Sequence, residues 1–171
     1  MDDTNPASIF INYRTSDEPV AAALLDTALS YRFGAENVFL DCRSMAAGTP
    51  FEKALRTAVR RCDVLLVVIG RNWLTATDQH GRRLIDQRGD WVRTEIAEAY
   101  RVGAHVVPVL VGDVPALAKA ALPPSIRQLA SNQFVRLRPR DSRSDLNQLV
   151  AQLQGLLPRF ADPSDSDPSA A

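Results

Sequence analysis

The sequence predicts a doubly wound α/β domain, in which helices cover both faces of a parallel sheet. Five hydrophobic runs of strand length alternate with helical segments, so that five βα units follow one another along the chain. Two of these runs, Val64–Ile69 and Val106–Val111, are apolar throughout. Continuous apolar runs are typical of strands in a parallel sheet that is covered on both faces.

Each element has a predicted range. The strands are expected at Ser8–Asn12, Asn37–Leu40, Val64–Ile69, Val106–Val111 and Gln133–Leu137. The helices are expected at Asp17–Phe33, Phe51–Arg61, Trp91–Val102, Pro124–Ala130 and Arg143–Leu157.

Residues that favour helix ends support these boundaries. Thr15 and Glu18 form a capping-box pattern, and Asp90 stands at the N-cap position of the helix that follows it. Gly34 and Gly103 come directly after predicted helix ends, where a residue with positive φ is favoured.

Two segments leave their structure open. Pro108 lies inside a predicted strand, although a proline there usually marks an edge or a bulge. The stretch Thr75–Gly89 is long and polar for a loop in a compact domain. It is either a lid or binding element, or a solvated excursion with a small hairpin.

The chain of 171 residues has room for one domain, which we place at residues 8–157. Residues 1–7 are expected to form a flexible N-terminus. Residues 158–171 are expected to be a disordered tail or linker, because they are polar and rich in Pro, Ser and Asp.

The charge balance limits the partners and the location of the protein. Twenty Lys and Arg balance twenty Asp and Glu, so no overall field attracts nucleic acid or anionic lipid, and we expect neither as a partner. The longest apolar run is far shorter than the ~20 residues that span a bilayer. The N-terminus also lacks the basic and apolar pattern of a signal peptide, so we expect a cytoplasmic location without membrane attachment.

Several common kinds of site are disfavoured. After Ile11 the chain reads "NYRTSDEPV", which lacks the glycine patterns of dinucleotide-binding and P-loop folds. His80 and His105 are in no recognisable triad context. Cys42 and Cys62 have no clustered histidines, so we expect no metal site and two inert thiols.

The segment "DWVRTEIAEAY" is the most informative part of the chain. In a helix that starts at Trp91, residues Val92, Ile96 and Ala99 form an apolar stripe facing the core. Trp91 and Glu95, four residues apart, then lie together on a neighbouring face at the core boundary. By spacing alone, ordinary amphipathic patterning explains this pair more often than a functional site does.

Four segments, taken together, resemble the TIR (Toll/interleukin-1 receptor) domain family from about Ser8 to Leu157. They are "SIFINYR", "VFLDCRSMAAGTPF", "RRCDVLLVVIGRNWL" and "DWVRTEIAEAYRVGAHVVPVLV". The resemblance implies a flavodoxin-like, five-stranded parallel sheet in a single domain, and the family's fourth strand tolerates a proline at the position of Pro108.

The resemblance also implies an activity and a site. Enzymatic members cleave the bond between nicotinamide and ribose in NAD with a Glu that follows a Trp by four residues, which makes Glu95 the catalytic candidate beside Trp91. Arg14, Phe51 and Asp41 match the family's substrate-binding positions. Phe51 and the tryptophan offer stacking surfaces, whereas Arg14 is suited to phosphates. NAD is then the substrate, and no cofactor is implied.

The second matching segment contains the family's BB loop, with Met45, Gly48 and Pro50 as candidate assembly residues. Enzymatic members complete their pocket with a second subunit, so we expect self-association with other TIR domains. A non-catalytic adaptor that acts only through such contacts is the alternative. A receiver domain is disfavoured, because Asp41 and Asp63 alone do not form the acidic cluster that it needs. Similarity to bacterial members suggests signalling in antiphage defence or in host manipulation.

Overall fold

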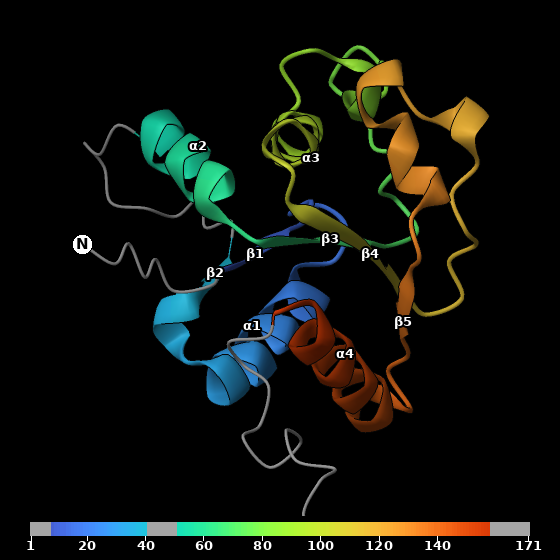
Figure 1. Cartoon of the computed structure of the whole chain (residues 1–171). Coiled ribbons are helices and arrows are strands. Elements are labelled where there is room, and N and C mark those ends of the chain that lie inside the picture. Colours follow the sequence, from blue (N-terminus) through green and yellow to red (C-terminus); the bar gives the residue numbers. More distant parts are fainter. Residues whose placement is uncertain (1–7, 41–50, 158–171) are drawn as a thin grey trace, which may run out of the picture.

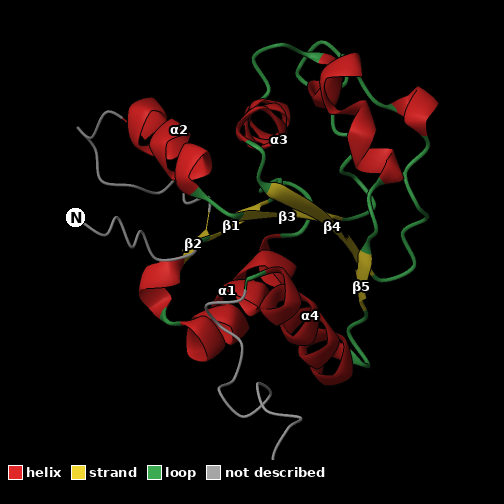
Figure 2. Ribbon diagram, in the orientation of Figure 1, coloured by secondary structure: helices red, strands yellow, loops and turns green. Residues whose placement is uncertain are grey.

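The computed structural model describes residues 8–40 and 51–157, with the backbone alone for residues 51–54. These residues form a five-stranded sheet with helices on both faces (Figure 1, Figure 2). The strands are β1 (Ile9–Asn12), β2 (Val38–Leu40), β3 (Val64–Ile69), β4 (His105–Val111) and β5 (Val135–Leu137). The α-helices are α1 (Pro19–Phe33), α2 (Phe51–Arg61), α3 (Trp91–Val102) and α4 (Ser142–Leu156).

The sheet has the strand order β2-β1-β3-β4-β5, and all pairs are parallel. The chain moves outward from β1 to β2 and then returns to β3 on the other side of β1. A topological switch point therefore lies between β1 and β3. The predicted fold class is confirmed, and every residue of β3 is buried, as its apolar sequence indicates.

The two layers of helices enclose two separate cores. In Figure 1, α1 and α4 lie below the sheet and α2 and α3 lie above it. Ile9 and Ile11 of β1 pack with the residues of α1 and α4, whereas Phe10 packs with those of α2 and α3. Successive side chains of a strand point to opposite faces. Asn12, two residues after Phe10, therefore faces the layer that contains α3.

Pro108 lies in β4, which is an interior strand, and yet it interrupts no pairing. The N–H group of Gly112 donates to Leu137 on the β5 side. Because N–H groups alternate in direction along a strand, the nitrogen of Pro108 faces the same side. Pairing between β4 and β5 begins only at Val109. An N–H group at position 108 would therefore have no neighbouring strand to bond to, and the proline costs the sheet no hydrogen bond.

The glycines and the aspartate predicted to end or begin helices do so. Gly34 and Gly103 follow α1 and α3 with φ of 92° and 79°. Asp90 is the N-cap of α3, where its side chain accepts a hydrogen bond from the backbone N–H of Arg93 at 3.1 Å.

The capping box predicted at Thr15 and Glu18 is wrong. Helix α1 begins at Pro19, with Glu18 at the N-cap position and no side-chain cap. A proline suits the first helical position because its φ is already helical and its missing N–H has no partner there. Asp17, predicted as the first helical residue, instead accepts hydrogen bonds from backbone N–H groups after β3, including that of Gly70 at 2.7 Å.

Two connecting segments remain to be compared with the prediction. One of them is a different kind of helix from the one expected, and the other matches one of the two predicted alternatives. The helix predicted at Pro124–Ala130 is a 3-10 segment, Pro124–Ser131, whose buried Ile126 and Leu129 are three residues apart and so match its period. The stretch Thr75–Gly89 is the small-hairpin alternative, since Thr77 and Arg83 form an antiparallel bridge. A short 3-10 turn, Leu84–Asp86, anchors that stretch by burying Ile85 completely.

Candidate active site

The central residues of the predicted site meet where β1 ends and α3 begins. Asn12 is the last residue of β1, and Arg14 follows two residues later. Trp91 is the first residue of α3, directly after its N-cap Asp90. Open α/β sheets bind ligands outside the carboxyl ends of the strands at a switch point, and β1 borders that point here.

Arg14 and Asp90 form a buried ion pair that joins the two segments. Both terminal nitrogens of Arg14 donate to the carboxylate of Asp90, at 2.8 and 2.9 Å. The side chains are only 5% and 6% exposed, so solvent screens this pair little. The contact anchors the first turn of α3 against the end of β1. A substrate phosphate at Arg14 would have to compete with this carboxylate.

Glu95 lies deeper than its sequence pattern indicates. The pattern places it at the edge of the core, whereas only 3% of the residue is exposed. Its Oε2 atom accepts a hydrogen bond from Nδ2 of Asn12, which is completely buried. Leu55 and Val59 of α2 lie across from it and cover this part of α3. The helix packed on α3, which helical spacing cannot report, accounts for the difference.

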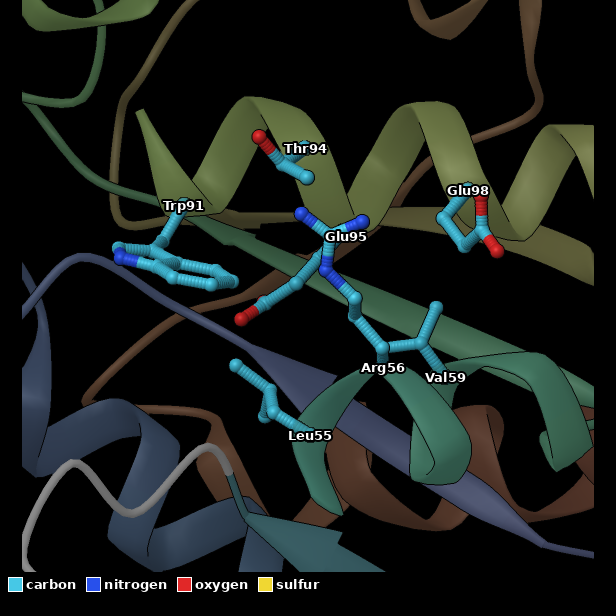
Figure 3. A pocket seen from close by; sticks show the side chains of 7 residues that line it. All are labelled: Leu55, Arg56, Val59, Trp91, Thr94, Glu95 and Glu98. Atoms are coloured by element: carbon cyan, nitrogen blue, oxygen red, sulfur yellow. The ribbon is translucent and has the colours of Figure 1, made fainter. Parts of the chain in front are cut away.

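A small pocket between α2 and α3 contains both residues of the predicted pair. Its walls are Leu55, Arg56, Val59, Trp91, Thr94, Glu95 and Glu98, and its volume is about 20 Å³. Figure 3 shows the Glu95 side chain extending from α3 toward Trp91 and Leu55. The exposed Arg56 forms part of the rim. A carboxylate, an indole and a guanidinium thus surround one opening.

Glu98 lies one turn further along α3 in a different environment. Arg60 of α2 donates to its Oε1 atom at 2.5 Å, and Arg101 donates to both of its oxygens at 2.8 Å. The hydrogen bonds from Arg101 and Arg60 lower the pKa of Glu98 to about 2. The side chain is 18% exposed. Its charge is therefore engaged in a surface ion-pair network.

Several predicted site residues cannot be located beside these. Asp41 and the assembly candidates Met45, Gly48 and Pro50 lie outside the described residues. Phe51 is the first residue of α2, and only its backbone is described. The functional roles of these residues remain predictions.

Other kinds of site find no support within the described ranges. No group of His, Cys, Asp or Glu in residues 8–40 and 51–157 could hold a metal ion. The same part of the chain has no helix long and apolar enough to cross a membrane. Burial raises the pKa of the Cys62 thiol to about 12, so the thiolate needed for reaction does not form near neutral pH. Cys42 lies outside the described residues.

Comparison with known proteins identifies the family. A family model for the TIR domain matches residues 9–150. The chain belongs to the TIR domain family. A search of curated proteins finds no match to this TIR domain.

Two solved structures resemble this TIR domain in fold. The TIR domains of the activated Roq1 resistosome, which directly recognizes the pathogen effector XopQ, match with a TM-score of 0.60 and 13% identity, over 86% of this chain and 99% of theirs. A prokaryotic SEFIR domain matches with a TM-score of 0.53 and 17% identity, over 97% of this chain and 99% of its own. At such identities the likeness concerns the fold alone.

Sequence reasoning missed two residues at this site of the TIR domain. The sequence analysis gives Asn12 no role beyond the first strand, although its place two residues after Phe10 puts it on the α3 face. Arg56 was assigned to a helix without a role, and it is four residues from Arg60 on α2. The alternation of β1 could have indicated the first. No sequence signal indicates the second, because it depends on how α2 packs against α3.

Proposed function

We propose that this TIR domain cleaves the bond between nicotinamide and ribose in NAD, giving nicotinamide and either ADP-ribose or a cyclic variant. The observation that carries the proposal is the Glu95 carboxylate, buried in a pocket wall beside Trp91 at the carboxyl end of β1. Burying a carboxylate costs several kcal/mol, roughly, unless it is paired and hydrogen-bonded. A carboxylate kept buried in a pocket wall is typical of a group whose charge is used in a reaction.

One carboxylate is enough for this chemistry. Most glycosidases need a second carboxyl group to protonate the leaving oxygen. In NAD the leaving group is a pyridinium that departs as neutral nicotinamide, so that proton is not required. The ribosyl centre then carries positive charge, which the Glu95 carboxylate stabilises most strongly in the transition state.

The surroundings of Glu95 suit the rest of the substrate. Trp91 offers an aromatic surface on which a nicotinamide or adenine ring can stack. Arg56, exposed at the rim, is placed to pair with the diphosphate. Arg14 is the alternative predicted for that role, but it would have to leave Asp90 to fill it.

Substrate binding requires the pocket to widen. A volume of about 20 Å³ holds about one water molecule and not a nicotinamide ring. The walls contributed by α2 and α3 must therefore separate, or their side chains rotate, when NAD enters. The small volume also favours the second candidate function, a TIR adaptor that signals through self-association without catalysis.

Self-association is part of both functions. The Roq1 structure, which matches in fold, contains the TIR domains of an activated resistosome. For this chain we infer that a second copy completes the pocket through the segment with Met45, Gly48 and Pro50. Specific activity should then rise with protein concentration, because the active species is the assembly. A flat specific activity across about a hundredfold dilution, with only monomer in sedimentation, would contradict this mechanism.

The proposed function is tested by product analysis. Purified protein, concentrated enough to assemble, is incubated with NAD, and nicotinamide, ADP-ribose and cyclic products are separated and quantified. Release of nicotinamide is expected. Its absence at every concentration would reject the enzyme and leave the adaptor. The identity of the second product distinguishes hydrolysis from cyclisation.

A further inference from the structure

We propose that Asn12 is a positioning residue for this reaction, in that its side-chain amide sets the orientation of the Glu95 carboxylate. The inference rests on the proposed function and adds a residue that acts on the substrate only through Glu95.

The contacts of Asn12 carry the inference. Its Nδ2 atom donates to Oε2 of Glu95 and, at 3.4 Å, reaches the backbone oxygen of Val92. The residue is completely buried, and Glu95 is 3% exposed. One amide group thus binds α3 at its first turn and at the carboxylate of the next turn. The carboxylate cannot rotate without losing a buried hydrogen bond.

The orientation of the amide follows from its neighbours. A carbonyl oxygen and a carboxylate oxygen both accept, so the group that faces them must be the NH₂ and not Oδ1. Oδ1 of Asn12 is buried with no hydrogen-bond partner among the described residues. The NH₂ group toward Glu95 is therefore the hydrogen-bonding group that this residue supplies to the site.

A neutral amide suits an orienting role beside a carboxylate that must act through its charge. It donates a hydrogen bond to the ionised form without adding a positive charge to the site.

The position of Asn12 in the sheet makes the orientation rigid. Asn12 ends β1 and is in register with Val67 of β3, and β1 also pairs with β2 on its other side. Groups that orient a reactive side chain work best on rigid elements, because a small displacement weakens the interaction with the transition state.

The main test is Asn12→Leu, which keeps the approximate shape and removes the donor. We expect kcat to fall about 10- to 100-fold, as for other residues that orient a functional group, with KM within about twofold. Asn12→Ser, whose side chain is too short to reach the carboxylate, should also lower kcat. This variant replaces Asn12→Leu in the test if the leucine prevents folding.

Asn37→Leu is the matched control. Asn37 is also a buried asparagine next to a strand, its Nδ2 donates to the Phe33 oxygen at 2.7 Å, and its Oδ1 also lacks a partner among the described residues. It lies directly before β2, outside the pocket walls. Its replacement should change thermal stability and leave kcat at the wild-type value.

A double variant makes the test specific to Glu95. In a Glu95→Gln background, Asn12→Leu should lower the residual kcat no further, because the group that it orients is gone. An unchanged kcat in folded Asn12 variants, or an equal loss in Asn37→Leu, would overturn the positioning role and leave the proposed function intact. A wild-type protein without activity would overturn both.

Discussion

The carboxylates at the two ends of helix α3 differ in burial and in the residues that bind them. At the N-terminal end, the side chain of the N-cap Asp90 and the residue Glu95 are buried, and each is bound by a side chain at or just after the end of β1. In the C-terminal half, Glu98 lies at the surface between Arg60 and Arg101. Residues of one type, three positions apart on one helix, thus have different surroundings.

The two environments differ in how much they affect the stability of the fold. An exposed ion pair contributes about 0 to 1 kcal/mol, and its loss is easily tolerated. A buried carboxylate is costly to keep unless it is paired, and buried carboxylates are common at functional sites. The N-terminal half of α3 is therefore the half in which substitutions should affect activity and folding most.

The largest expected effect is that of Glu95→Gln on catalysis. The change removes the charge and keeps the shape, and we expect nicotinamide release to fall by a factor of about 10²–10³ or more. The substituted side chain would still offer Asn12 a carbonyl oxygen, so the melting temperature should change little. Steady-state assays and thermal unfolding of both proteins check this. A variant as active as wild type would show that the catalytic carboxylate is another residue.

The next effect concerns stability. Arg14→Met leaves the Asp90 carboxylate buried without its partner, and breaking a buried pair costs about 3–5 kcal/mol. Arg60→Met breaks a pair whose arginine is 52% exposed, and should cost about 1 kcal/mol at most. Urea unfolding of the two variants measures the difference. Equal losses would mean that burial does not separate the two halves of α3.

A smaller effect is expected for Glu98→Gln. Nicotinamide release should stay near the wild-type rate, because this carboxylate is held by Arg60 and Arg101 and lies farther from Trp91. A large loss of activity would place Glu98 in the reaction.

The same variant has a defined pH dependence. The two arginines lower the pKa of Glu98 from an ordinary 4.5 to about 2 in the folded protein. Its stabilising contribution is therefore present above the ordinary value and is lost as the pH falls toward 2. Wild type should be slightly more stable than Glu98→Gln near neutral pH, and unfolding curves should converge in acid. A gap that widens in acid would contradict the ion-pair assignment.

The smallest effect is expected for a change outside both halves. Deletion from Ala161 onward removes a polar segment with few apolar residues, so the melting temperature should stay within about two degrees. A calorimetric scan of the shortened chain tests this. A large drop would show that the segment packs on the domain and that the boundary at residue 157 is wrong.

The order and type of the elements could be predicted because they depend on local patterns. The apolar run of β3 and the cap at Asp90 act through burial and hydrogen bonds among neighbours in the sequence. The start of α1 was missed because two local signals compete, and Pro19 overrides the capping box at Thr15. The segment at Pro124 became a 3-10 turn because a period of three buries its two apolar residues.

By itself, the sequence determined the α/β sheet, the order of its elements, the family and the Trp91–Glu95 pair, since each depends on periodicity or on residues close together in the chain. Only the tertiary structure decided that Glu95 is buried, that Asn12 donates to it and that Arg14 is bound to Asp90. These contacts join residues more than 70 positions apart. Spacing along one helix reports which face a side chain occupies, but the strand and helix packed against that face determine its charge environment.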